Sequence, residues 1–228
     1  APHLADGERT VLERLLQRRF SCRGFLAQEV PQPVIERILA MARHTASWCN
    51  SQPWQVHITR GQATERFRQA LFAHASEHDG RPDFPFPAQY TGAYRDRRRE
   101  CGFQLYEAVG VARGDREASR RQALENFRLF GAPHVAIVTT EADLGIYGAV
   151  DCGAYVGNFM LAAQSLGVAS IAQAALASHP DFIRRHFGLP DNRLVVCAIS
   201  FGYADLAHPA NGFRTRRAEV AETTTFHD

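Results

Sequence analysis

The sequence predicts an α+β fold in which a small mixed central sheet is surrounded by helices. Helical patterns fill most of the first half, whereas the second half interleaves helices with short buried strands. Only about four strands are recognisable, and they lack the regular alternation with helices of a parallel α/β protein. No Gly-x-Gly-x-x-Gly motif follows a strand, which argues against a Rossmann fold. At 228 residues, we expect one domain over residues 1–228.

In the first half, helices are identified by apolar residues that recur every three or four positions. Val34, Ile35 and Ile38 begin such a stripe directly after Pro33, and this helix should stop near Thr45. The elements expected here are helices over 6–18, 33–45, 64–75 and 92–111 and a strand over 54–59.

In the second half, one segment stands out because residues 149–166 are apolar nearly all round. Such a helix lies at the centre of a fold or in a dimer interface. A shorter helix should begin with Ser178 as its N-cap and Pro180 in its first turn, and stop at Gly188. The other expected elements are a helix over 116–130 and strands over 134–140, 168–172 and 193–201, followed by a polar, arginine-rich tail.

The basic residues are all arginine: Lys and Arg together number 26, and no lysine occurs. A Schiff base to pyridoxal phosphate and a phosphate-loop lysine are therefore excluded. The net charge of +2 gives no strong attraction to nucleic acid or membranes, so we expect neither as a partner. Five dispersed cysteines without a Cys-x-x-Cys pair, and no long apolar segment, predict a cytoplasmic protein with free thiols.

Two local patterns have a functional and a plainer interpretation. His74, Glu77 and His78 fit His-x-x-Glu-His, which binds zinc in some peptidases, but a solvated helix end explains them better and we expect no metal. The run over 95–100 is rich in arginine, but its interleaved acids are typical of a solvated helix face. The Gly-x-Ser-x-Gly elbow of serine hydrolases is absent.

Two arginine clusters lie far apart in the sequence, RRFSCRGF over 18–25 and GFRTRRAE over 212–219. If they converge, Arg19, Ser21 and Arg217 offer charge-assisted hydrogen bonds to one phosphate group. Spacing alone favours the plainer interpretation, that both clusters are exposed ends of helices and loops.

The chain resembles the FMN-dependent nitroreductase family, in particular bacterial members that reduce nitrobenzoates and related nitroaromatics. The resemblance rests on an ordered set of segments that covers nearly the whole chain: RRFSCRGF, ASWCNSQPW, ENFRLFGAPHVAIV, GNFMLAAQSLG, ASIAQAALA and HPANGFRTRRAEVAE. It implies an intertwined homodimer with two FMN molecules at the subunit interface. It also implies NAD(P)H as electron donor, a small nitroaromatic substrate, and ping-pong reduction of the nitro group to nitroso and hydroxylamino products.

The resemblance also implies where the flavin is held, and it assigns the chemistry to FMN rather than to a catalytic side chain. Arg23 would lie over the flavin pyrimidine edge and stabilise the negative charge of the reduced ring. Asn126 would hydrogen-bond the pyrimidine side. The remaining implied contacts are Arg19, Phe20, Ser21, Arg214 and Arg217 around the phosphate, Ser47, Trp48, Asn50 and Gln52 from the partner subunit, and Ala172, Gln173 and Ala174 beside the ring.

The chain departs from the family pattern at a few positions. Ala46 replaces a proline, Phe20 stands where some relatives have histidine, and Ala172-Gln173-Ala174 replaces Pro-x-Glu. The last change removes a glutamate that contacts nicotinamide ribose, so NADH and NADPH both remain open as donors. Reductive dehalogenation or another flavin-mediated reduction on the same scaffold is an alternative activity. A non-catalytic flavin- or nucleic-acid-binding protein is the alternative of another class.

Overall fold

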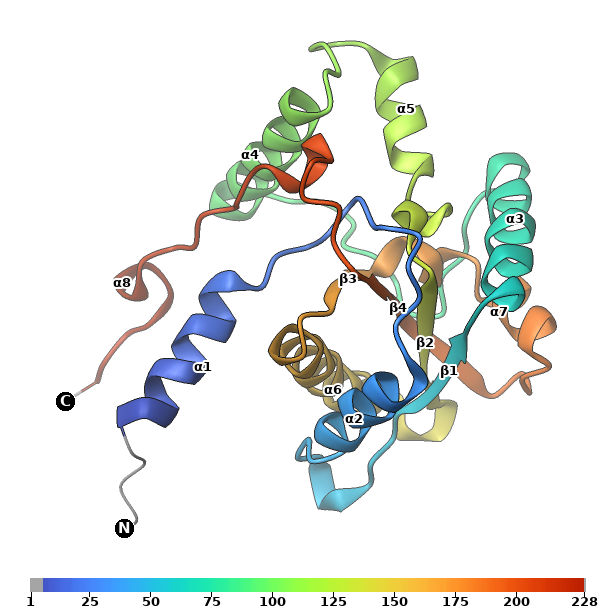
Figure 1. The fold of residues 1–228 in the computed structure, drawn as a ribbon, viewed down its shortest axis with the longest axis horizontal. Helices are drawn as coiled ribbons and strands as arrows, with labels where there is room; N and C mark the ends of the chain where they lie inside the picture. The colour runs from blue at the N-terminus through green and yellow to red at the C-terminus, as the bar shows by residue number, and fades with distance from the viewer. Residues whose placement is uncertain (1–5, 228) are drawn as a thin grey trace.

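The computed structural model describes residues 6–227 (Figure 1). Its sheet has four strands, β1 (Gln55–Thr59), β2 (His134–Glu141), β3 (Ala169–Gln173) and β4 (Arg193–Gly202), in the order β1-β2-β4-β3. All three neighbouring pairs are antiparallel. The sheet is therefore not mixed as expected, although an isolated parallel bridge joins Ser21 to Ser170 at the β3 edge. The α+β class is confirmed.

The helices surround this sheet (Figure 1). In chain order they are α1 (Asp6–Arg18), α2 (Gln32–Ala42), α3 (Gln62–Glu77), α4 (Gly92–Ala108), α5 (Arg116–Leu124), α6 (Gly145–Ser165), α7 (Pro180–Phe187) and the single turn α8 (Val220–Thr223).

Some helix boundaries differ from the expected ones. The helix expected over 116–130 ends at Leu124, after which the backbone tightens into turns, with the Phe127 amide donating to the Leu124 carbonyl at 3.0 Å. The backbone then turns left-handed at Leu129 and Phe130, with φ of 58° and 52°. The central helix α6 begins at Gly145 instead of residue 149. Ser178 does not cap α7, since it closes a preceding 3-10 helix, but Gly188 ends α7 in the expected left-handed conformation.

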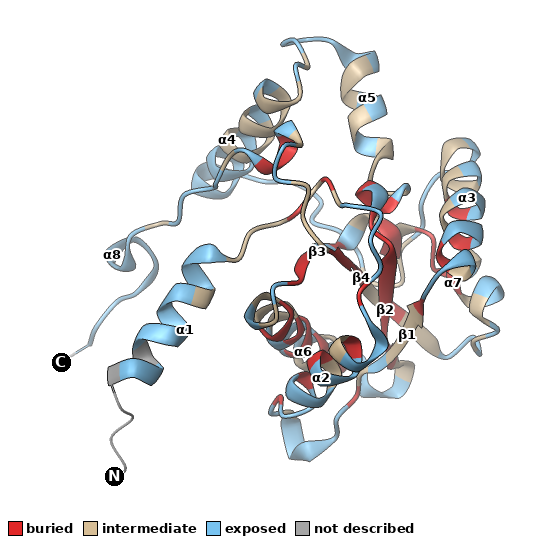
Figure 2. Cartoon of the chain, viewed as in Figure 1, coloured by how far each residue is buried: buried red, intermediate tan, exposed pale blue. Residues whose placement is uncertain are grey.

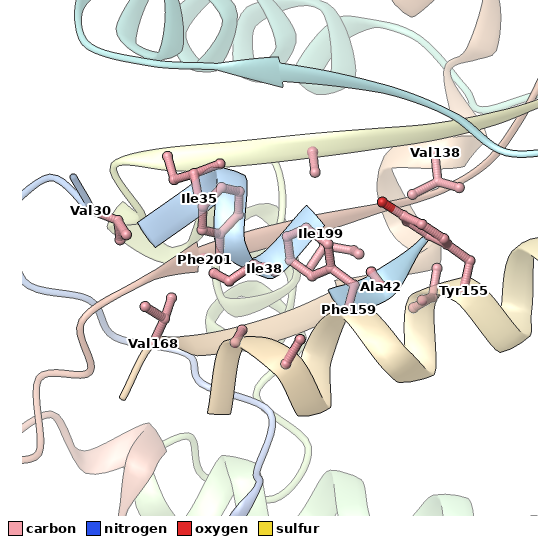
Figure 3. Packing of buried hydrophobic residues seen from close by; sticks show 14 of the residues in the cluster. Val30, Ile35, Ile38, Ala42, Val138, Tyr155, Phe159, Val168, Ile199 and Phe201 are labelled. Atoms are coloured by element: carbon pink, nitrogen blue, oxygen red, sulfur yellow. The ribbon is translucent and has the colours of Figure 1, made fainter. Parts of the chain in front are cut away.

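Two apolar layers cover the two faces of the sheet. Successive residues of a strand point to opposite faces, so Ala136 and Val138 of β2 pack with α2 and α6 (Figure 3). Val135 and Ile137 of the same strand pack on the other side against α3 and α7. Because both faces are covered, β2 is buried almost along its whole length (Figure 2).

Several elements lie apart from these layers. Helix α1 and the segment that carries α8 extend away from the sheet and are mostly exposed (Figure 2). Helix α4 has no buried residue, and α1 exposes Val11, Leu12 and Leu16. Within the described residues, none of the helices is both long and apolar enough to span a membrane.

Candidate functional site

A pocket of about 490 Å³ forms where the segment after α1 meets the segment after β4. Its walls contain four arginines, Arg19, Arg23, Arg214 and Arg217, and no carboxylate. The two basic clusters of the sequence therefore do converge. The complete lining is Leu16, Gln17, Arg19, Phe20, Ser21, Arg23, Cys101, Ala210, Phe213, Arg214, Thr215 and Arg217.

The first wall is held against the β3 edge of the sheet. Ser21 forms the parallel bridge with Ser170, and the Cys22 amide donates to the Ser170 carbonyl at 3.2 Å. The Arg23 guanidinium donates to the Ser21 carbonyl at 3.3 Å, which folds its side chain back over the pocket wall. Burial lowers the pKa of Arg23. Its charge is thus kept in a partly desolvated position, where an anion would be bound more strongly.

The second wall follows the 3-10 helix Pro209–Asn211. The Arg214 guanidinium donates to the carbonyls of Asn211 and Phe213, both at 2.7 Å, and lies 3.9 Å above the Phe20 ring. The Arg217 guanidinium donates to the Thr215 hydroxyl at 2.8 Å. These partners are neutral, and among the described residues neither arginine is seen in an ion pair, so both keep their charge available to a ligand.

The charges of the two walls repel each other. Burial lowers the pKa of Arg19, and the charge of Arg217 lowers it further. The guanidinium groups of Arg19 and Arg217 are near each other, and no acidic residue lines the pocket. Such a pair suits a ligand with two negative charges. A phosphate monoester carries about that charge at neutral pH, and the Ser21 side chain adds a hydroxyl donor. The residues present therefore fit the phosphate end of a small molecule.

The residues expected from the ASWCNSQPW segment lie elsewhere in the same chain. None of Ser47, Trp48, Asn50 and Gln52 lines the pocket. The Trp48 amide donates to the Asp151 carboxylate of α6 at 3.0 Å, and its ring is 60% exposed beside Tyr147. The backbone is left-handed at Cys49, Asn50 and Gln52 with φ of 52°, 54° and 48°. Left-handed non-glycine residues cluster at active sites and ligand-binding segments, so this segment is a candidate for such a role.

The residues expected beside the ring lie at the end of β3. Ala172 and Ala174 are exposed, but the Gln173 side chain points inward and is only 2% exposed. Its amide nitrogen donates to the carbonyl and side-chain oxygens of Asn126 at 3.0 Å and 3.2 Å, and its oxygen accepts from the Ser200 hydroxyl. Gln173 thus joins β3 to Asn126, and its side chain is not free to contact a ligand.

The His-x-x-Glu-His pattern forms part of a histidine cluster at the end of α3. The rings of His74 and His78 stack at 4.2 Å, and His179 lies 5.1 Å from His74. Burial lowers the pKa of His74 and of His179. Stacked rings do not point their nitrogens at a common centre, and no cluster suited to a metal ion occurs among residues 6–227.

Sequence reasoning did not identify Asn211 and Cys101 as residues of this region. Asn211 is buried behind the pocket and contacts both walls. Cys101 comes from α4, far from both clusters in the sequence, and lines the pocket beside Arg23. The polar Asn211 inside HPANGFRTRR was the available signal, whereas nothing in the sequence near Cys101 indicated its position.

The fold is of the α+β class, and the arginine-lined pocket fits the phosphate end of a small molecule. The family model described as "Nitroreductase family" matches residues 16–203. The chain is 36% identical over 215 residues to "Nitroreductase NfnB" of Mycolicibacterium smegmatis, covering 94% of this chain and 92% of that protein. It is 32% identical over 218 residues to "Nitrobenzene nitroreductase" of Ectopseudomonas oleovorans, covering 94% and 96%.

Comparison with solved structures also finds a nitroreductase. The FMN-dependent nitroreductase NfnB from Mycobacterium smegmatis, in complex with NADPH, superposes with a TM-score of 0.92 at 35% identity, over 97% of this chain and 100% of that chain. The chain belongs to the nitroreductase family.

Proposed function

We propose that the protein is an FMN-dependent NAD(P)H oxidoreductase that reduces nitroaromatic compounds to nitroso and hydroxylamino products. The observation that carries this proposal is the pocket with four arginines and no acid, which suits the phosphate of FMN. It is supported by the relatives, which include a nitrobenzene nitroreductase and an FMN-dependent nitroreductase bound to NADPH.

Within this proposal, the phosphate is bound by Arg19, Ser21, Arg214 and Arg217, and Phe20 supports Arg214 by stacking. Arg23 lies at the pyrimidine edge of the flavin. Asn126 binds the pyrimidine side, and the backbone of Ala172–Ala174 runs past the ring. The assignments of the arginines, Phe20 and Ser21 rest on the family resemblance together with their convergence in one pocket. Those of Asn126 and Ala172–Ala174, which do not line this pocket, rest on the resemblance alone.

We further propose that the protein is a homodimer, and that one flavin-binding domain spans the chain. Ser47, Trp48, Asn50 and Gln52 then complete the site of the partner subunit, which accounts for their absence from the pocket of their own chain. The apolar residues exposed on α1 and α6 provide the surface for this contact; on α6, Ile146 and Val150 are 71% and 58% exposed. The five unpaired cysteines favour the cytoplasm as its location.

When bound, FMN supplies the hydride chemistry, so the chain's own residues need only bind, orient and tune it. The arginines neutralise the phosphate and anchor one end of the cofactor. The Arg23 guanidinium, held by the Ser21 carbonyl, favours negative charge on the nearby part of the flavin. No side chain acts as a general acid or base in this scheme, which agrees with the absence of a paired acid in the pocket.

The proposal is tested by reconstituting the purified chain with FMN and titrating it with NADH or NADPH without oxygen. We expect the flavin absorbance to bleach with one of the donors and to return when nitrobenzene is added. Mass spectrometry should then identify the hydroxylamine. A chain that binds no flavin, or a reduced flavin that nitrobenzene does not reoxidise, would contradict the proposal.

A further inference from the structure

Asn211 is a buried polar residue at the junction of the two pocket walls. Its side chain is 4% exposed, and its oxygen accepts the Arg23 backbone amide at 2.7 Å. Its amide nitrogen donates to the carbonyls of Gly24 and Asp205, both at 2.8 Å. The two segments joined in this way lie 188 residues apart in the sequence.

The orientation of this amide is determined by its partners. A backbone carbonyl only accepts hydrogen bonds and a backbone amide only donates them. The nitrogen of Asn211 must therefore face Gly24 and Asp205, and its oxygen must face Arg23. Both of its N–H groups are used, so no other side chain of this size can satisfy all three partners. Aspartate lacks the two donors, and alanine lacks every polar atom.

The main chain of Asn211 also holds the second wall. Its carbonyl accepts the Arg214 guanidinium at 2.7 Å. One residue thus fixes the backbone at Arg23 through its side chain and the guanidinium of Arg214 through its carbonyl. The backbone at Gly24, one of the partners of Asn211, is tightly packed. A Cβ atom added at Gly24 would lie 2.3 Å from Cγ of His208.

We propose that Asn211 is a positioning residue that sets the spacing of the arginines around the phosphate, and that it thereby makes the protein select phosphorylated over unphosphorylated flavin. This inference rests on the proposed function. The guanidinium groups of Arg19 and Arg217, one from each wall, repel each other and do not hold their spacing by themselves. A neutral, fully hydrogen-bonded link between the walls holds them together without weakening their charge.

The test compares the dissociation constants of FMN and riboflavin for the apoprotein, measured by quenching of flavin fluorescence. Asn211→Ala should raise the dissociation constant of FMN by about tenfold or more, because buried partners lose their hydrogen bonds and the arginines lose their spacing. The dissociation constant of riboflavin should rise several-fold less, because riboflavin has no phosphate and is affected only through Arg23 at the pyrimidine edge of the ring. Aspartate has the same shape as asparagine but adds a negative charge. Asn211→Asp should therefore raise the dissociation constant of FMN at least as much as Asn211→Ala does.

Thr64→Ala is the matched control. Thr64 is also buried and hydrogen-bonded, through its hydroxyl to that of Thr59, but it lies on α3 outside the pocket. It should lower the melting temperature without changing the ratio of the two dissociation constants. The inference is overturned if Asn211→Ala or Asn211→Asp raises the dissociation constants of FMN and riboflavin equally, or leaves that of FMN unchanged. The proposed function stands in both cases.

A measurement on the wild-type chain covers the case in which neither variant folds. FMN should protect the amides of 22–25 and 210–215 from hydrogen exchange together, and riboflavin should protect them much less. Equal protection by the two flavins would overturn the inference. If the wild-type chain binds neither flavin, the proposed function itself fails and the inference fails with it.

Discussion

At the scale of single residues, the pocket holds positively charged arginines by hydrogen bonds to neutral acceptors. Arg23, Arg214 and Arg217 donate to backbone carbonyls and a threonine hydroxyl, so their side chains are oriented while their charges stay available. A guanidinium bound to a carboxylate would be just as well oriented, but it would attract a phosphate less. Orientation by neutral partners therefore favours anion binding.

Arg19→Ala should weaken FMN binding by about 1.5–3 kcal/mol, the value of a hydrogen bond to a charged group. This corresponds to a dissociation constant about ten to a hundred times higher. Fluorescence titration of the apoprotein measures it. Arg120→Ala, on the exposed face of α5, is the control and should bind FMN like the wild type. Unchanged flavin affinity in Arg19→Ala would contradict the role assigned to this arginine.

His134 makes stability depend on pH. Its ring is fully buried, Nε2 accepts the Val30 amide at 2.9 Å, and Nδ1 lies 3.2 Å from the Thr59 carbonyl. Burial lowers the pKa of His134 from its ordinary value of 6.5, so the folded chain keeps the ring neutral where the unfolded chain takes up a proton. Unfolding is thus favoured as the pH falls below 6.5, and this dependence ends once the lowered pKa is passed.

Urea unfolding should give a lower free energy of unfolding at pH 5.5 than at pH 7.5. One histidine contributes at most about 1.4 kcal/mol per pH unit to this difference. His134→Gln should lower stability at both pH values and reduce the difference between them. Burial also lowers the pKa of His57 and His186, so part of the pH dependence should remain in the variant. A variant with the full wild-type difference would show that His134 is not its source.

At the scale of elements, α6 packs closely against the sheet at Gly148. A Cβ atom at this position would lie 2.6 Å from Oγ1 of Thr140 and 2.9 Å from Cβ of Leu144. Gly148→Ala should therefore cost about 1–3 kcal/mol through overpacking. Gly102 in α4 has no such neighbour within 4 Å, so Gly102→Ala should gain about 0.5–1 kcal/mol from helix propensity.

Thermal or urea denaturation of the two glycine variants measures this contrast. Opposite signs are expected for the same chemical change, since one methyl group meets packed atoms and the other meets open space. Equal effects in both variants would mean that helix propensity, and not the contact between α6 and β2, decides the stability at Gly148.

The elements that the sequence predicts well are those with a local cause. The apolar stripe of α2 and the glycine that ends α7 act within a few residues, and both elements formed as expected. The end of α5 at Leu124 was missed, because the residues that follow form turns and then a left-handed backbone at Leu129 and Phe130 that their side chains do not signal. All four strands were recognised, but their antiparallel pairing depends on contacts distant in the sequence.

The site was predictable to the extent that residue type reveals chemistry. The arginine clusters indicated a phosphate, and the structure brings them into one pocket. The inward orientation of Gln173 follows from the alternation along β3, which a correct strand register would have revealed. Asn211 could not be singled out, because its importance comes from partners that only the fold brings near.

At the scale of the whole molecule, the chain exposes apolar surface where a partner would cover it. If the proposed dimer forms, Val150→Arg should convert it into monomers, because it places a charge on the exposed apolar face of α6. Since the partner would supply Ser47–Gln52, the monomer should also bind FMN about tenfold more weakly or worse.

Light scattering coupled to size exclusion measures the mass of this variant, and fluorescence titration measures its flavin affinity. Gln69→Arg, on the exposed side of α3, adds the same charge away from α6 and should remain dimeric. A monomeric Val150→Arg with wild-type flavin affinity would show that one subunit suffices for the site. A wild-type chain that is monomeric would contradict the dimer directly.

The link between Asn211 and Arg23 also has a consequence for how the protein matures in the cell. The ribosome synthesises the two walls of the pocket 188 residues apart. A nascent chain therefore cannot enclose its cofactor before Asn211 has been synthesised and has joined Arg23. A shortage of the cofactor should leave folded but empty molecules.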